Sequence, residues 1–215
     1  MDFNKILSTV LNTAKQSAEN IKKPSESTAD TITKVGGGAA LAGLLSMVLG
    51  RNGGKNLTKM GSLAVLGSLA YKAYQDYQKN QSASTELTAN EFENTDHSQE
   101  EKSAVMLRTM IAAALADGEI SEQERAIIAQ ESGENPELQQ WLQSETQRPI
   151  SVNEIARIVG NDIALASQVY LAARVVCQEL SRKEIIFLSQ LAAALKLDDA
   201  LVEQLEKQAG FLMYL

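Results

Sequence analysis

The sequence lacks most of the residues that build catalytic and zinc centres. It contains one cysteine, Cys177, and one histidine, His97. A single cysteine excludes a disulfide within the chain and fits a reducing compartment. One cysteine and one histidine also exclude a Cys/His zinc site within one chain. His97 lies in a polar stretch with no catalytic partner near it in sequence, which favours a solvated linker residue.

Aromatic residues and strand patterns are also scarce. Only 5% of the residues are aromatic, although 44% are hydrophobic, and alanine and leucine dominate that fraction. Runs of β-branched residues that alternate with polar ones are missing. This composition is typical of helices packed on helices, so we expect an all-α protein.

The net charge of −7 hides a difference between the two parts of the chain. Residues 1–80 carry a net charge of +5 and residues 81–215 carry −12. The acidic part should repel nucleic acid, so we expect no nucleic-acid partner. The basic part is suited to an anionic lipid surface.

Residues 1–34 are expected to form an amphipathic helix followed by a polar linker. The apolar residues recur at offsets of three and four, on one face of a helix: Phe3, Ile6, Leu7, Val10, Leu11, Ala14, Ala18 and Ile21. This face either packs on the rest of the protein or lies on a membrane surface. The sequence leaves both interpretations open.

Residues 35–79 are expected to form a Gly/Ala-rich apolar helical hairpin. Residues 35–50, "VGGGAALAGLLSMVLG", carry no charge, and a basic turn separates them from a second apolar run at 60–70. Neither run reaches the roughly 20 residues that span a bilayer. The segment could be a short re-entrant or interfacial hairpin, a single span extended into its flanks, or a helical pair packed on a partner in the cytosol. Exposed apolar surface is rarely left bare, which favours membrane association through residues 35–74.

Small residues in this hairpin follow helical spacing. Two sets would each form a smooth stripe on a helix: Gly38, Ala42, Ser46 and Gly50, and then Gly61, Ala64, Gly67, Ala70 and Ala73. Such stripes allow two backbones to approach closely, as between membrane helices. Three tyrosines follow, at 71, 74 and 77, and either lie at a membrane interface or form a packing face.

Residues 80–97 form a polar linker, and residues 98–215 are expected to form one compact domain of about seven helices. Several local signals mark helix starts in this domain: capping boxes at Ser98/Glu101 and Ser151/Glu154, Pro136 at a first helical position, and Asp198 before a last helix that ends ahead of Gly210. Trp141 is expected to anchor a core or an interface.

The domain contains an internal repeat. A shift of 60 residues places "IAAALADGEISEQERAII" over "LAARVVCQELSRKEIIFL". Glu119 then matches Glu179 and Glu124 matches Glu184, whereas Asp117 matches Cys177. Two copies indicate a duplicated helix–turn–helix unit rather than a solenoid. Cys177 itself is expected to be a small buried or half-buried residue.

The motif "ADGEISEQERAII" and its degenerate copy resemble the TerB-like domain, named after tellurite-resistance protein B. The apolar Gly-rich part before it resembles the YebE-type subfamily of bacterial inner-membrane proteins, whose function is unknown. The resemblance implies an all-helical domain, an acidic cluster that binds divalent metal, no enzymatic activity and a role in stress response.

The acidic turn contains the candidate metal ligands Asp117, Glu119, Glu122 and Glu124. Ser121 and Glu124 also form a capping box, so a turn between two helices explains much of the motif. Asp117, however, follows an apolar helical run, where the helix dipole disfavours an anion. A hard cation such as Ca²⁺ or Mg²⁺, or a basic residue such as Arg125 or Arg174, would balance these charges.

We therefore expect a non-enzymatic, membrane-associated protein whose TerB-like domain is a cation-responsive interaction module. It would lie at the bacterial inner membrane with this domain in the cytoplasm, and would bind a protein partner or itself. The alternatives are a metal-assisted hydrolase that uses paired carboxylates such as Asp117 and Glu124, or a cytoplasmic structural protein that oligomerises. No small-molecule substrate is indicated.

Overall fold

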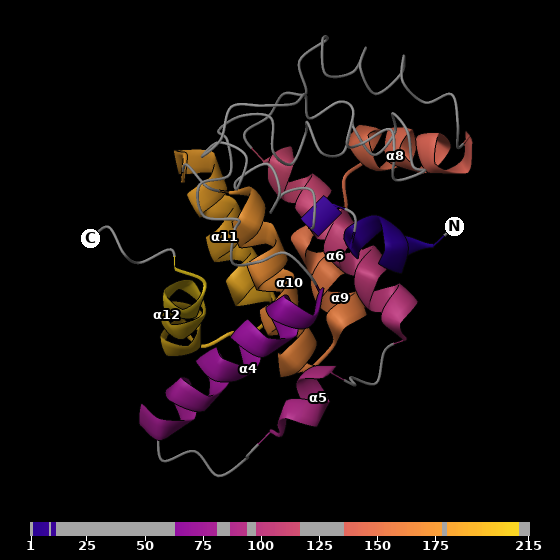
Figure 1. The fold of residues 1–215 in the computed structure, drawn as a ribbon. Helices are drawn as coiled ribbons and strands as arrows, with labels where there is room; N and C mark the ends of the chain where they lie inside the picture. Colours follow the sequence, from indigo (N-terminus) through magenta and orange to yellow (C-terminus); the bar gives the residue numbers. More distant parts are fainter. Residues whose placement is uncertain are drawn as a thin grey trace, which may run out of the picture.

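The described part of the chain is entirely helical. The computed structural model describes residues 2–8, 10–11, 63–80, 87–93, 98–116, 136–177 and 180–210, and none of these forms a strand (Figure 1). Residues 3–8 and 10–11 are helical. The labelled helices are α4 (Leu63–Asn80), α5 (Ala89–Glu93), α6 (Gln99–Ala114), α8 (Pro136–Gln147), α9 (Val152–Val159), α10 (Ile163–Val176), α11 (Arg182–Ala194) and α12 (Asp199–Gln208). The predicted all-α class is confirmed.

Helix starts follow the local signals in the sequence. Three helices begin at complete capping boxes, namely α6 with Ser98 and Glu101, α9 with Ser151 and Glu154, and α11 with Ser181 and Glu184. Asp198 caps α12, and α8 begins at Pro136, as predicted. Each cap satisfies amide groups that the first turn of a helix leaves unpaired.

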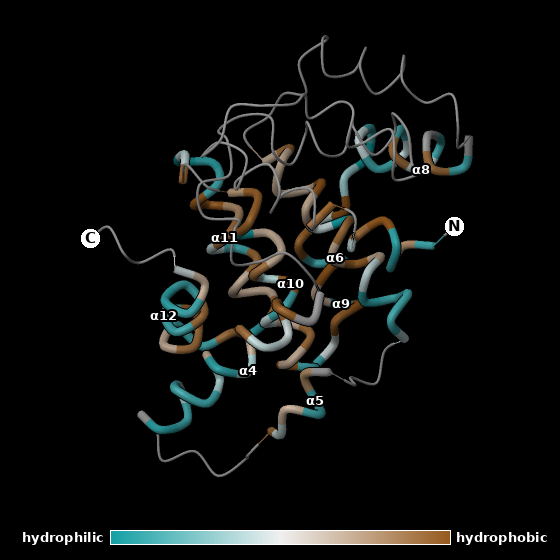
Figure 2. The backbone as a smooth tube through the Cα atoms, viewed as in Figure 1, coloured by the Kyte–Doolittle hydropathy of each residue, from teal (hydrophilic) through white to brown (hydrophobic). Residues whose placement is uncertain are grey.

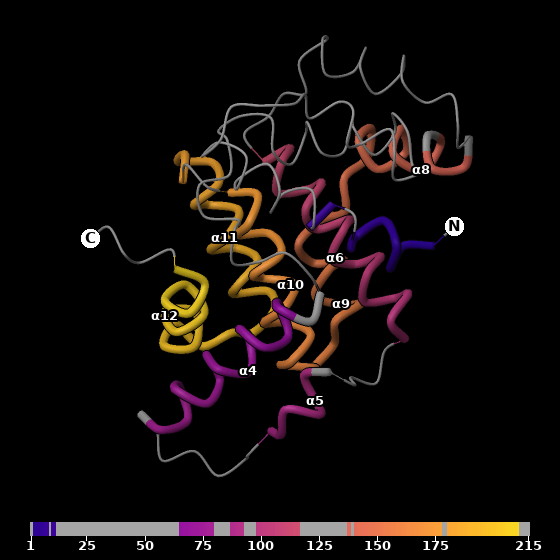
Figure 3. Tube along the Cα trace, viewed as in Figure 1, coloured from indigo at the N-terminus to yellow at the C-terminus, as the bar shows by residue number. Residues whose placement is uncertain are grey.

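Helix α10 lies at the centre of the domain. Every residue from Ala164 to Val175 is buried. Helices α4, α5, α6, α9, α11 and α12 all pack against it (Figure 3). A largely apolar helix that is buried around its whole circumference needs neighbours on all sides, so α10 determines where the other helices lie.

Helix α4 belongs to this core. Leu66, Ala70, Ala73 and Tyr74 are buried, and α4 packs along α10 and α12. The C-terminal half of α4 is mostly hydrophilic (Figure 2). Residues 63–80 therefore share one hydrophobic cluster with residues that follow position 98.

The tyrosines of α4 form a packing face. The rings of Tyr71 and Tyr74 lie 5.5 and 5.6 Å from the ring of Phe92 in α5, measured between centroids. Tyr77 lies 6.1 Å from Tyr74. Of the two predicted roles, the structure supports packing within the protein.

The small residue at position 67 permits a close approach between α4 and α5. A Cβ atom added to Gly67 would lie 3.4 Å from the carbonyl oxygen of Phe92. The same oxygen accepts a hydrogen bond of 2.8 Å from Nε2 of Gln168 in α10. The predicted close backbone approach thus occurs here between two helices of the same domain.

Several predictions concern residues outside the described part. Residues 12–62, which contain the first half of the apolar hairpin, and residues 117–135, which contain the acidic turn, are among them. The twofold repeat stays a prediction, because its first copy continues into 117–135. Among the described helices, none combines the length and apolar character that a bilayer crossing needs.

Substitutions at Gly67 test the contact between α4 and α5. Gly67→Ala should leave the free energy of unfolding unchanged or raise it by up to about 1 kcal/mol, because alanine favours a helix and 3.4 Å is an ordinary contact. Gly67→Leu should lower it by about 1–3 kcal/mol, because the larger side chain meets α5 backbone. Urea unfolding measures both values, and equal stability of the two variants would contradict the packing.

Candidate functional site

The predicted metal ligands Asp117, Glu119, Glu122 and Glu124 lie outside the described residues, as do His97 and Arg125. Helix α6 ends at Ala114, and the description of this segment stops at Ala116. Within the described ranges, no three His, Cys, Asp or Glu residues are grouped so that they could hold a metal ion. The cation site therefore stays a prediction.

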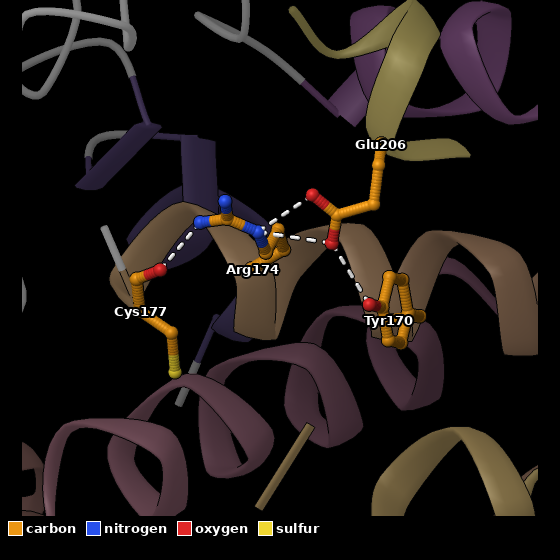
Figure 4. Close-up of polar contacts among 4 residues, drawn as sticks. All are labelled: Tyr170, Arg174, Cys177 and Glu206. Atoms are coloured by element: carbon orange, nitrogen blue, oxygen red, sulfur yellow. Dashed lines mark hydrogen bonds and ion pairs between the residues drawn. The ribbon is translucent and has the colours of Figure 1, made fainter. Parts of the chain in front are cut away.

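A buried polar cluster joins α10 to α12 (Figure 4). Nε of Arg174 donates to both carboxylate oxygens of Glu206, at 2.9 and 2.8 Å. The hydroxyl of Tyr170 donates to Oε1 of the same carboxylate at 2.8 Å. Nη1 of Arg174 donates to the carbonyl oxygen of Cys177.

The local sequence places these groups together. Tyr170 and Arg174 are four residues apart on α10, so both side chains lie on one face of the helix. Arg174 is in the last turn, where it reaches a carbonyl group beyond the helix end. Glu206, in the last turns of α12, lies opposite that face.

Burial determines the ionisation state of Tyr170 and strengthens the ion pair between Arg174 and Glu206. The Arg174 side chain is 3% exposed and that of Glu206 is 15% exposed. Burial raises the pKa of Tyr170, and the negative charge of Glu206 raises it further. Tyr170 is therefore a protonated donor, and the cluster holds α12 against α10.

Two sequence hypotheses concern residues of this cluster. Cys177 is fully buried, as predicted. Arg174, one suggested counter-charge for the acidic turn, forms an ion pair with Glu206; its role toward the turn stays a prediction, because Asp117 to Glu124 lie outside the described residues. The sequence analysis missed Glu206, because it lies 32 residues from Arg174 and in a helix with an ordinary amphipathic pattern.

Further charged side chains lie on α6 and against it. Lys102 is 2% exposed, and burial lowers its pKa, partly opposed by the charge of Asp162. Nε of Arg108 lies 2.8 Å from Oε1 of Glu145 in α8. In the described part, Oε2 of Glu145 and Oγ of Ser103 are buried without a hydrogen-bond partner.

The N-terminal end of the first helix contacts α6. The Glu100 carboxylate accepts hydrogen bonds from the backbone amides of Phe3, at 2.6 Å, and Asn4, at 3.4 Å. The side chain of Asp2 accepts from the amide of Lys5 at 2.8 Å. Together, two carboxylates satisfy the first amides of the N-terminal helix, which would otherwise be unpaired.

The apolar face of the N-terminal helix completes this contact. The Phe3 ring meets Trp141 of α8 edge to face, with centroids 5.1 Å apart. Four further apolar residues of this face are described, and all are buried in the hydrophobic core cluster: Ile6, Leu7, Val10 and Leu11. Figures 1 and 3 show the N-terminal segment beside α6 and near α8. Of the two predicted roles for this face, the structure supports packing, and Trp141 is an interface anchor as predicted. We call the part of α6 and α8 around Glu100 and Trp141 the docking surface.

These features define an all-helical domain built around one buried helix, with an amphipathic helix from a distant part of the chain docked on it. The family model described as "Protein of unknown function (DUF533)" matches residues 34–209, so the chain belongs to this family. No curated protein and no solved structure gives a significant match. The matched range contains α4 to α12 and excludes the N-terminal helix.

Removal of Arg174 tests the polar cluster. Arg174→Ala should lower the free energy of unfolding by about 3 kcal/mol or more, because it leaves a largely buried Glu206 without its counter-charge. The double variant Arg174→Met with Glu206→Leu should lose much less, since neither charge remains. Denaturant unfolding of both proteins checks this, and a cost below about 1 kcal/mol for Arg174→Ala would refute the role of the pair.

The pKa of Tyr170 predicts a loss of stability at high pH. The unfolded chain releases a tyrosine proton near pH 10, whereas the folded protein retains it because its pKa is raised. This contribution to stability is therefore complete below about pH 10 and is lost as the pH rises further. Between about pH 9 and 11, the unfolding free energy of the wild type should fall more steeply than that of Tyr170→Phe. Parallel pH curves would contradict the expectation.

Proposed function

We propose that this protein is a non-enzymatic, membrane-associated interaction module. One observation carries the proposal: the domain binds an amphipathic helix that comes from a distant part of its own chain. The backbone amides of Phe3 and Asn4, at the start of that helix, donate hydrogen bonds to Glu100, which lies 97 and 96 residues further along the chain. A domain that recognises a helix end and its apolar face has the chemistry of a helix-binding protein.

The finer features of the proposal come from the sequence. The chain is proposed to be a TerB-like protein of the YebE type, at the bacterial inner membrane with its helical domain in the cytoplasm. Because α4 packs in the domain core, the membrane contact is assigned to residues 35–62. The acidic turn, Asp117 to Glu124, is proposed to bind Ca²⁺ or Mg²⁺ and to make the module responsive to that cation.

Vesicle flotation tests the membrane part of the proposal. The full chain should float with vesicles made of bacterial lipids. A variant lacking residues 35–59 should stay in the dense fraction, because it keeps α4 and loses the uncharged apolar run. Circular dichroism checks that the deletion variant remains helical. Flotation of this variant at the level of the wild type would place the membrane contact elsewhere.

A matched variant separates the cation from the membrane. Ca²⁺ or Mg²⁺ should raise the midpoint of thermal unfolding of the wild type in a saturable way. Asp117→Asn with Glu119→Gln should float like the wild type and lose that shift. If neither cation shifts the unfolding midpoint of the wild type, the acidic turn is only a capping box between two helices.

A further inference from the structure

We propose that the docking surface is a binding site for an amphipathic partner helix, and that residues 2–11 are its built-in competitor. The inference rests on the proposed function as an interaction module and names the partner that the module takes. The contacts of the N-terminal helix describe that partner's chemistry.

The carboxylate of Glu100 recognises a helix start rather than particular side chains. It accepts hydrogen bonds from two backbone amides, those of Phe3 and Asn4. Every helix carries unpaired amides in its first turn, and its N-terminal end favours a negative charge. Glu100 can therefore receive the first turn of any helix that reaches it.

Selectivity comes from the apolar contacts beyond this end. The ring of Phe3, at the first helical position, meets Trp141, and two aliphatic pairs follow, Ile6/Leu7 and Val10/Leu11, whose side chains are buried in the hydrophobic core cluster. This spacing repeats every three to four residues, as helix-in-groove partners do. The expected partner helix thus has an acidic cap, an aromatic residue in the first turn and two aliphatic pairs on one face.

The docked helix is remote in sequence from the surface that it covers. Residues 12–62, a stretch of 51 residues, separate the docked helix from the start of α4. The docking surface also lies inside the range that the family model matches, whereas the docked helix lies outside it.

A peptide with the sequence of residues 1–12, labelled at its C-terminus, serves as the partner helix. In the full-chain variant Leu7→Asp, the chain's own helix loses its apolar face and should leave the surface. Peptide binding measured by fluorescence anisotropy should be at least tenfold tighter to this variant than to the wild type, where the surface is occupied. Trp141 is the only tryptophan, so its emission should shift to the red in Leu7→Asp and return when the peptide binds.

Controls distinguish docking from a general loss of structure. Lys5→Ala changes an exposed side chain and should bind the peptide as weakly as the wild type. Glu100→Ala in the Leu7→Asp background should weaken peptide binding, and a peptide carrying Leu7→Asp should not bind. If Leu7→Asp fails to fold, Phe3→Ala provides the same comparison through the loss of the contact with Trp141.

Two outcomes would overturn the proposal. A folded Leu7→Asp variant that does not bind the peptide would mean that the surface holds only its own helix. A shift of Trp141 emission in the wild type on adding lipid vesicles, without any peptide binding, would assign residues 2–11 to lipid. In either case, flotation that depends on residues 35–59 would leave the proposed membrane association standing.

Discussion

The complete burial of α10 is the constraint on which the rest of the domain depends. A helix that is buried from Ala164 to Val175 needs neighbours on every side, and six helices supply them. The polar side chains on α10 also have to be paired, because an unpaired polar group in a core is costly. Gln168 binds the α5 carbonyl of Phe92, and Arg174 binds Glu206 of α12. These two bonds hold α5 and α12 against their faces of α10.

The same logic explains why α4 belongs to the domain. Its apolar face continues the covering of α10, and Asp76 near its end accepts a hydrogen bond of 2.8 Å from Gln208 of α12. A stripe of small residues predicts that two backbones approach closely, and at Gly67 they do. The stripe does not identify the partner helix, because small residues allow close packing against a second membrane helix and against a helix of the same domain alike.

Glu100 and Glu101 illustrate which contacts can be predicted from the sequence and which cannot. Glu101 closes a capping box with Ser98, three residues away, and the motif predicts this contact correctly. Glu100, its neighbour, caps a helix that begins 97 residues earlier. No local pattern distinguishes these two glutamates. The candidate cation site cannot be compared in this way, because Asp117 to Glu124 lie outside the described residues.

Local sequence signals account for the helical character of the described segments and for the positions at which several of them begin. Caps and helical periodicity involve residues within about four positions of one another, so they can be recognised from the sequence. The contacts of the N-terminal helix with Glu100 and Trp141, and of Arg174 with Glu206, follow from the packing of the helices and not from any local pattern. These partners lie far apart in sequence, and the way in which helices pack around α10 brings them together.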